Sequence, residues 1–236
     1  MRPQRLKQPY ALVVKPARPL RTPRSEDSGS SVYRRPLYCD QVLVGEQEWK
    51  PELLAEYELN PAIIYVLDSA FRIAYCNLAW DRFALENGGN CVLRKEQIGR
   101  SAIDATPARL RPFYIAIYSR VLQYGEAADC VYECSSPETL RRFHMHVKRR
   151  DTGKGAFIVV MNSPILEEPH PERDAPYDTD ALRDKHGLIT MCTHCRRTRL
   201  PVSPDTWVWV PELVRRMPPE VSHGICSVCF DIYYGS

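Results

Sequence analysis

Residues 60–87, NPAIIYVLDSAFRIAYCNLAWDRFALEN, contain the signals of two strands, a turn and a helix. Residues 62–67 form an apolar run rich in β-formers, which predicts the first strand. Asp68 and Ser69 have side chains typical of turns. In residues 71–75, Phe71, Ile73 and Tyr75 alternate with Arg72 and Ala74. This alternation predicts a second strand that is half buried.

A helix is predicted to follow, ending at Asn87. Asn77 is placed to cap it, because its side-chain oxygen can accept hydrogen bonds from N–H groups of the first turn. Trp80 and Phe83 lie on one helical face, and Gly88 can adopt the left-handed conformation that ends many helices. This order of strand, turn, strand, Asn and helix resembles the opening of a PAS domain. The resemblance implies that the segment forms one wall of the space in which such a domain holds what it binds.

The pattern continues through residues 106–164. Thr106 and Pro107 predict the start of a long helix, and Gly125 predicts its end. An apolar stripe at helical spacing predicts its core face: Leu110, Phe113, Tyr114, Ile117, Val121 and Tyr124. Alternating residues then predict three strands, the last of them (AFIVVMN, 156–162) central. Residues 46–165 therefore resemble an α+β PAS fold, a five-stranded antiparallel sheet with flanking helices.

The resemblance also implies what the domain binds. A haem-binding PAS domain ligates iron through a His on the long helix, and residues 106–124 contain none. In a light-sensing flavin PAS domain a reactive Cys stands where this chain has Ala102. We therefore expect neither haem nor flavin. The PAS ligand is unknown, and a small organic molecule is expected against these side chains: Tyr65, Trp80, Phe83, Tyr114 and Met145.

The last fifty residues contain a different chemistry. MCTHC places Cys192 and Cys195 in one CxxC pair, and ICSVC places Cys226 and Cys229 in a second. Two such turns give the four-sulfur set that zinc prefers. Between the pairs, TWVWV predicts a strand and residues 211–216 a short helix. A segment this small needs the metal for its stability.

Residues 187–236 also resemble a zinc-ribbon-like C-terminal module of bacterial signalling proteins. The resemblance rests on the first CxxC with its two following arginines, a central Trp, and the ending Ser-His-Gly-Ile-Cys-x-x-Cys. One closed, structural zinc site is the simplest assignment. His194 or His223 in place of one Cys, and a thiol–disulfide switch, remain alternatives.

The composition indicates a tail and a linker beside the two domains. The chain has 236 residues and a net charge of +3. Its first 36 residues contain nine basic and two acidic side chains, a charge of +7, so the remaining residues together have a charge of −4. Residues 1–45 are Pro-rich and predicted to be disordered. The charged, Pro-rich stretch 166–186 is predicted to be a linker that includes His170 and His186. The lack of a signal peptide or an apolar span predicts a cytoplasmic protein without membrane contact.

Two other groups of side chains have simpler explanations. His144 and His146 share a strand face with basic neighbours, which indicates exposure to solvent rather than a metal site. Four cysteines of the predicted PAS domain are expected to be small buried hydrophobes. They are Cys76, Cys91, Cys130 and Cys134.

Two functional hypotheses follow from these features. The first is a non-catalytic signalling protein, a PAS sensor or interaction domain whose output runs through a signalling-protein partner. A homodimer is a candidate assembly, through the apolar helix predicted over 51–59 and the outer face of the sheet. The second is a regulator that binds nucleic acid through the tail and five arginines of the module: Arg196, Arg197, Arg199, Arg215 and Arg216.

Overall fold

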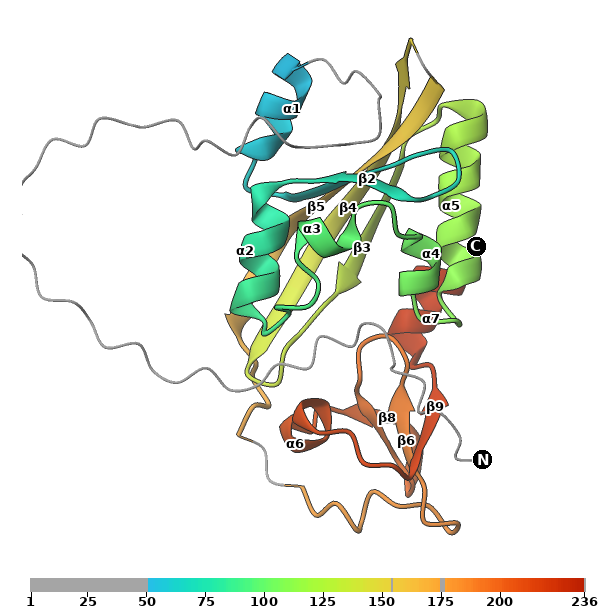
Figure 1. Ribbon diagram of the computed structural model, residues 1–236. Coiled ribbons are helices and arrows are strands. Elements are labelled where there is room, and N and C mark those ends of the chain that lie inside the picture. The colour runs from blue at the N-terminus through green and yellow to red at the C-terminus, as the bar shows by residue number, and fades with distance from the viewer. Residues whose placement is uncertain (1–50, 154, 175–176, 236) are drawn as a thin grey trace, which may run out of the picture.

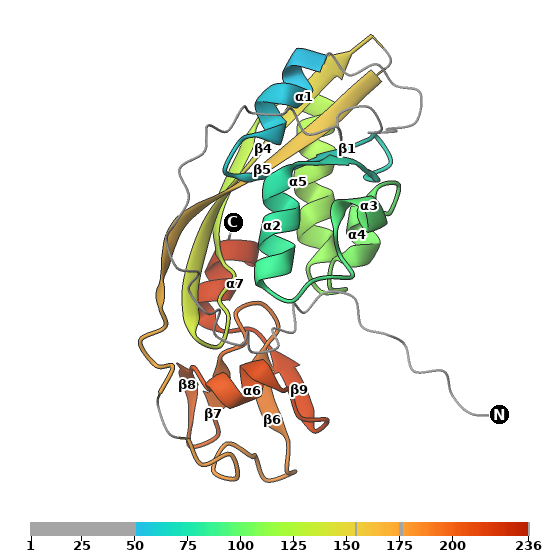
Figure 2. The ribbon, with the colours of Figure 1, turned by 60° about the vertical axis from the view of Figure 1, so that its left-hand side comes forward.

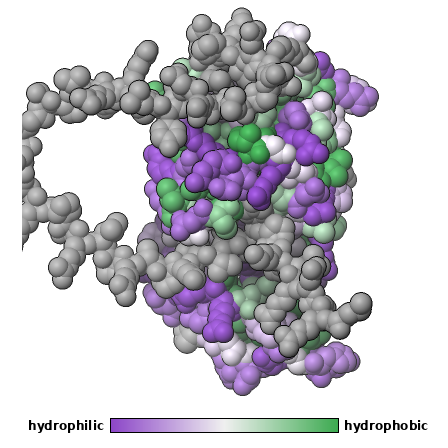
Figure 3. All heavy atoms as spheres, in the orientation of Figure 1, coloured by the Kyte–Doolittle hydropathy of each residue, from purple (hydrophilic) through white to green (hydrophobic). Residues whose placement is uncertain are grey.

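The computed structural model describes residues 51–153, 155–174 and 177–235, with side chains from residue 55 onward. Within them lie two sheets, one of five strands in the order β2-β1-β5-β4-β3 and one of four in the order β8-β7-β6-β9 (Figure 1). The tail expected over 1–45 lies outside the described residues. On the described part of the face in Figure 3, hydrophilic residues predominate and hydrophobic ones are scattered.

The five-stranded sheet is antiparallel throughout and forms a PAS fold. Its strands are β1 (Ile63–Leu67), β2 (Ile73–Cys76), β3 (Ala128–Glu133), β4 (Thr139–Thr152) and β5 (Gly155–Pro169). Strand β5 lies at the centre, as predicted for residues 156–162. It continues to Pro169, so the first residues of the expected linker pair with β4 instead.

The opening segment folds around Asn77, whose side chain is fully buried. Its Oδ1 accepts from the backbone N–H of Trp80 at 3.2 Å and so caps α2 (Leu78–Glu86), as predicted. Gly88 has φ +71°, which confirms the left-handed end of that helix. Phe71 is a correction: it has φ +59° and lies in the turn, because Asp68 Oδ1 accepts from the backbone of Ala70 and Arg72.

Helices cover both faces of this sheet, which explains a second correction. Strand β2 is buried along its whole length rather than half buried. On one face, α2 and α5 (Arg111–Tyr124) cover the larger core, around Leu67, Met145 and Val160. On the other, α1 (Pro51–Glu58) places Tyr57 in a smaller core with Tyr75 and Phe157. The side chains of Leu53 and Leu54, part of the expected dimer face, lie outside the described residues.

The long helix begins later than predicted. Thr106 ends the short helix α4 (Ala102–Ala105), and its hydroxyl donates to the Ala102 carbonyl at 2.8 Å. A residue before proline avoids the helical region, so Pro107 separates Thr106 from α5. Gly125, with φ +75°, ends α5 as predicted. Tyr124 is 65% exposed, and Tyr118 takes its place in the core. The remaining short helix is α3 (Arg94–Gln97).

The four-stranded sheet and two helices form the C-terminal module. Its elements are β6 (Ile189–Cys192), β7 (Thr198–Leu200), β8 (Ser203–Val208), α6 (Pro211–Arg215), β9 (Val221–Gly224) and α7 (Ser227–Tyr234). The predicted strand and short helix between the two CxxC pairs are therefore present, as β8 and α6. A small apolar core lies beneath them, centred on Ile189, Met191 and Leu213.

The module packs against the PAS domain rather than standing apart from it (Figure 2). Trp209 is fully buried, and its indole N–H donates to the Pro137 carbonyl in the β3–β4 turn at 3.1 Å. His170 stacks on the Trp209 ring with centroids 4.3 Å apart and is 1% exposed. His170 was expected to be a linker residue, and in the structure it fills the junction of the two domains. His186 is exposed, as a linker residue should be.

Candidate functional site

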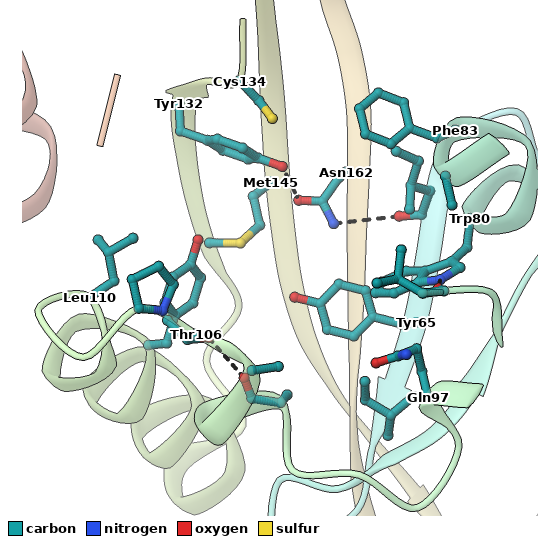
Figure 4. Close-up of a pocket in the computed structure, with 18 of the residues that line it drawn as sticks. Tyr65, Trp80, Phe83, Gln97, Thr106, Leu110, Tyr132, Cys134, Met145 and Asn162 are labelled. Atoms are coloured by element: carbon teal, nitrogen blue, oxygen red, sulfur yellow. Dashed lines mark hydrogen bonds between the residues drawn. The ribbon is translucent and has the colours of Figure 1, made fainter. Parts of the chain in front are cut away.

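A cavity of about 320 Å³ lies between the PAS sheet and its helices. All five residues predicted for the ligand pocket line it: Tyr65, Trp80, Phe83, Tyr114 and Met145. Figure 4 shows four of them converging on the hollow: Tyr65 from β1, Trp80 and Phe83 from α2, and Met145 from β4. Trp80 is held by a hydrogen bond from its indole N–H to the Val92 carbonyl at 2.8 Å, and its ring meets Tyr65 edge-on at 5.6 Å.

The cavity wall is largely apolar, with a few polar groups among the aromatic rings. The hydroxyls of Tyr65 and Tyr118 are 2.9 Å apart, and the Tyr132 hydroxyl donates to Asn162 Oδ1 at 3.0 Å. The Tyr114 hydroxyl has no hydrogen-bond partner within the described part of the chain. A molecule in the cavity could therefore exchange a hydrogen bond with it.

No lining side chain is charged at neutral pH. Burial raises the pKa of Tyr65 to about 12, and it also raises the pKa values of Tyr114, Tyr118 and Tyr132. The phenols therefore stay protonated. Because nothing here compensates the desolvation of a charge, the cavity favours an uncharged molecule.

Several lining residues were not predicted from the sequence. Asn162 is a polar residue directly after the apolar run 156–161 of the central strand, which was a usable signal. Tyr118 follows Tyr114 at helical spacing, which was another. Gln97 and Tyr132 reach the cavity only through tertiary packing, and the sequence gives no sign of either. Ala102, which stands where a flavin-binding relative would have its Cys, also lines the cavity.

The second site gathers the four cysteines of the CxxC pairs. Strands β6 and β9 are parallel neighbours, with Cys192 opposite Gly224, so both pairs follow at the same end of the sheet. The four sulfur atoms lie within 4.8 Å of one another, and each residue is at most 5% exposed. Neither His194 nor His223 belongs to this group. The structure therefore brings together the four predicted ligands.

The sulfur spacing fits a tetrahedral metal. Zinc–sulfur bonds of about 2.3 Å require sulfur atoms about 3.8 Å apart in a tetrahedron. Cys195 Sγ and Cys226 Sγ are 3.6 Å apart. The backbone N–H of Cys226 points at Cys192 Sγ at 3.4 Å, an arrangement that favours a thiolate. The pKa of Cys192 is well below its ordinary value because the thiols of Cys195, Cys226 and Cys229 hydrogen-bond to it.

Arg197 connects this centre to the PAS domain. Its guanidinium pairs with Glu133 at 3.0 Å, and its backbone carbonyl accepts from the N–H of Cys192 at 2.7 Å. Burial opposes the charge, but Glu133 and Cys195 raise the pKa of Arg197 above its ordinary value. A positive charge at this place stabilises a cluster of thiolates.

Three comparisons with known proteins bear on the fold. No protein-family model and no curated protein sequence matches the chain. Among solved structures, the PAS domain of BvgS from Bordetella pertussis is similar, with 20% identity, TM-score 0.40, and coverage of 50% of this chain and 86% of that chain. The PAS domain of an HTR-like protein from Haloarcula marismortui is 18% identical with TM-score 0.32, covering 48% and 89%.

Vibrio cholerae VqmA, described as a dimer in the absence of target DNA in a study of LuxR-type receptors, is 11% identical with TM-score 0.39. That similarity covers 50% of this chain and 52% of VqmA. Each of the three concerns about half of this chain. At these sequence identities and TM-scores, the similarities assign no function to this chain.

The remaining candidate residues have ordinary surroundings. His144 Nε2 and His146 Nδ1 both contact Asp129 Oδ1, at 2.9 and 2.8 Å, on an exposed part of the sheet. Cys91 is exposed rather than buried, whereas Cys76 is buried as expected. Cys130 and Cys134 are partly buried.

Two of the five arginines considered for nucleic acid already have carboxylate partners. Arg197 pairs with Glu133, and Arg215 pairs with Glu138 at 2.6 Å. Both therefore face the PAS domain. None of the helices in the described ranges is long and apolar enough to cross a membrane.

Proposed function

We propose that this chain is a non-catalytic sensory protein whose PAS cavity binds an uncharged small molecule. The cavity carries this proposal: it holds about 320 Å³ and offers aromatic walls, a few hydrogen-bonding groups and no ionised side chain. Ligand pockets in proteins commonly have this size and this mainly apolar lining. An aromatic molecule with one hydroxyl, carbonyl or amide group fits these walls best.

The cysteine centre supplies a structural role beside the sensor. We propose that Cys192, Cys195, Cys226 and Cys229 hold one zinc ion, which the sulfur spacing supports. Four protein ligands leave no position for water, so this centre would fold the module rather than catalyse hydrolysis. Output would pass by contact to a signalling-protein partner.

Probe binding tests the sensory proposal. The neutral fluorophore 1-aminoanthracene is titrated into the full chain and into two variants, each of which has one alanine replaced by phenylalanine. Ala105→Phe places a ring in the cavity wall, whereas Ala116→Phe places it on the exposed side of α5. We expect saturable binding to the unmodified chain and to Ala116→Phe, and at least about tenfold weaker binding to Ala105→Phe.

Equal affinity in all three proteins would locate the probe elsewhere and contradict the proposal. Circular dichroism of Ala105→Phe checks that the fold persists. A smaller substitution, Ala105→Leu, repeats the test if the larger one fails to fold.

Self-association through α1 stays a prediction. Tyr57 packs on the chain's own sheet against Tyr75 and Phe157, so removing residues 1–59 would also uncover that core. Sedimentation of the intact chain over a range of concentrations is therefore the cleaner measurement. A mass that stays at one chain throughout would exclude the dimer.

A further inference from the structure

Cavity-lining residues and module-contacting residues alternate along the segment between α4 and α5. Pro107 and Leu110 line the cavity. Between them, the Arg109 guanidinium donates to the His223 carbonyl at 3.0 Å, and the Arg109 carbonyl accepts from the Tyr234 hydroxyl at 2.9 Å. The module thus holds the very loop that closes this side of the cavity.

In the first turn of α5, a cavity-lining residue again lies next to a residue that contacts the module. Tyr114 lines the cavity, and its neighbour Phe113 packs edge-on against Tyr233 of α7 with centroids 4.9 Å apart. The rings of Phe113 and Tyr114 also touch, at 5.3 Å. A shift of α7 would therefore move the aromatic pair that includes one cavity wall.

Strand β3 provides a third point of contact. Tyr132 and Cys134 line the cavity, and Glu133 between them pairs with Arg197. Because side chains alternate along a strand, Glu133 points away from the cavity and towards the module. Arg197 in turn contacts the cysteine centre, because its backbone carbonyl accepts from the N–H of Cys192 at 2.7 Å. One chain of contacts therefore joins a metal ligand to two cavity residues.

The module's side of these contacts depends on the cysteine centre. Helix α7 begins directly after Cys226 and includes Cys229, and Tyr233 lies one turn further along it. His223 is in β9, which leads into the same pair, and Arg197 follows Cys195 by two residues. A metal ion that fixes the four sulfur atoms would also fix the groups that touch the cavity segments.

We infer that metal loading of the cysteine centre and occupation of the PAS cavity are thermodynamically coupled. The module would thus receive the state of the cavity directly, through residues 109, 113 and 133. This inference rests on the proposed function. Coupling between two sites is reciprocal, so whatever the metal adds to the cavity's affinity, a cavity ligand adds to the metal's.

Two ion pairs between the PAS domain and the module can be compared to test this coupling. Glu133–Arg197 and Glu138–Arg215 both join the PAS domain to the module. Glu133 lies between two cavity residues, whereas Glu138 lies in the β3–β4 turn and does not line the cavity. Glu133→Gln and Glu138→Gln each remove one carboxylate of the same kind and touch no metal ligand.

The first measurement is the dissociation constant of 1-aminoanthracene for the full chain, with zinc bound and after chelation. We expect chelation to weaken binding about fivefold in the unmodified chain and in Glu138→Gln. The zinc-bound Glu133→Gln variant should already bind 1-aminoanthracene more weakly than the zinc-bound unmodified chain. Chelation should then change the affinity of this variant less than it changes that of the unmodified chain. Equal constants with and without zinc, or the same zinc effect in both variants, would overturn the inference.

The second measurement needs no ligand. Hydrogen–deuterium exchange of the full chain is followed with zinc and after chelation, over residues 106–114 and 130–134 and over the control strand 157–160. We expect chelation to accelerate exchange in the first two segments and to leave the control unchanged. Unchanged exchange in all three would refute the coupling, even if probe binding supports the sensory proposal. Faster exchange without any probe binding would instead refute the proposed ligand class and retain the coupling.

Discussion

The side chain of Asn77 joins three elements by hydrogen bonds. Its Oδ1 accepts from the backbone N–H groups of Ile64 and Trp80, at 3.0 and 3.2 Å. Its Nδ2 donates to the carbonyls of Tyr57, Asn60 and Ala62. Asn77→Ala would leave these buried groups without partners, and we expect it to lower the free energy of unfolding by about 2–4 kcal/mol.

Urea unfolding followed by circular dichroism measures this change. Asn90 is exposed, and Asn90→Ala is the control, which should alter the free energy of unfolding by no more than about 0.5 kcal/mol. Equal stability of the two variants would show that the hydrogen bonds of Asn77 do not hold these elements together.

His170 makes the domain junction sensitive to acid. Burial lowers the pKa of its imidazole below the ordinary 6.5, with Glu172 and Glu133 raising it and Arg197 lowering it. As the pH falls below about 6.5, the unfolded chain binds this proton more readily than the folded chain. Stability should therefore decline from pH 7 to pH 5, in addition to any effect of acid on the cysteines.

His170→Phe keeps an aromatic ring against Trp209 and removes the titrating group. We expect its thermal unfolding midpoint to fall less between pH 7 and pH 5 than that of the unmodified chain. His186→Phe, at an exposed position, should follow the unmodified chain. Identical pH profiles for His170→Phe and the unmodified chain would show that this imidazole does not set the acid sensitivity.

Gly224 lets two elements of the module approach closely. A Cβ added there would lie 3.1 Å from the Trp207 ring and 3.3 Å from Thr190 Cγ2. Gly224→Ala should therefore strain the contact between β9 and β8 and lower the free energy of unfolding of the module by about 1–3 kcal/mol. Gly153→Ala, where the added Cβ meets nothing within 4 Å, is the control. Urea unfolding followed by Trp fluorescence compares them, and equal midpoints would contradict this explanation.

At the level of helices and strands, local chemistry predicted some starts and ends and missed others. The Asn77 cap and Gly125 could be predicted because each acts on its own helix. The start of α5 could not, since Pro107 and Pro112 both suit a first turn and the sequence does not distinguish them. The length of β5 was missed because its last residues pair with β4 and lack apolar alternation of their own.

At the scale of the whole molecule, the sequence predicted two domains but not their contact. The CxxC spacing indicated the cysteine centre, and the apolar faces of β1, α2 and α5 indicated the cavity. Trp209 and His170 gave no such sign, because their partners are 72 and 39 residues away in the chain.

The zinc content and free-thiol count of the purified full chain show whether a PAS sensor is joined to a zinc module. We expect one zinc ion per chain and nine free thiols once the metal is removed in denaturant, one for each cysteine of the sequence. Cys226→Ser should lose the zinc. A chain without zinc, in which the four cysteines of the CxxC pairs are joined in disulfides, would contradict the account.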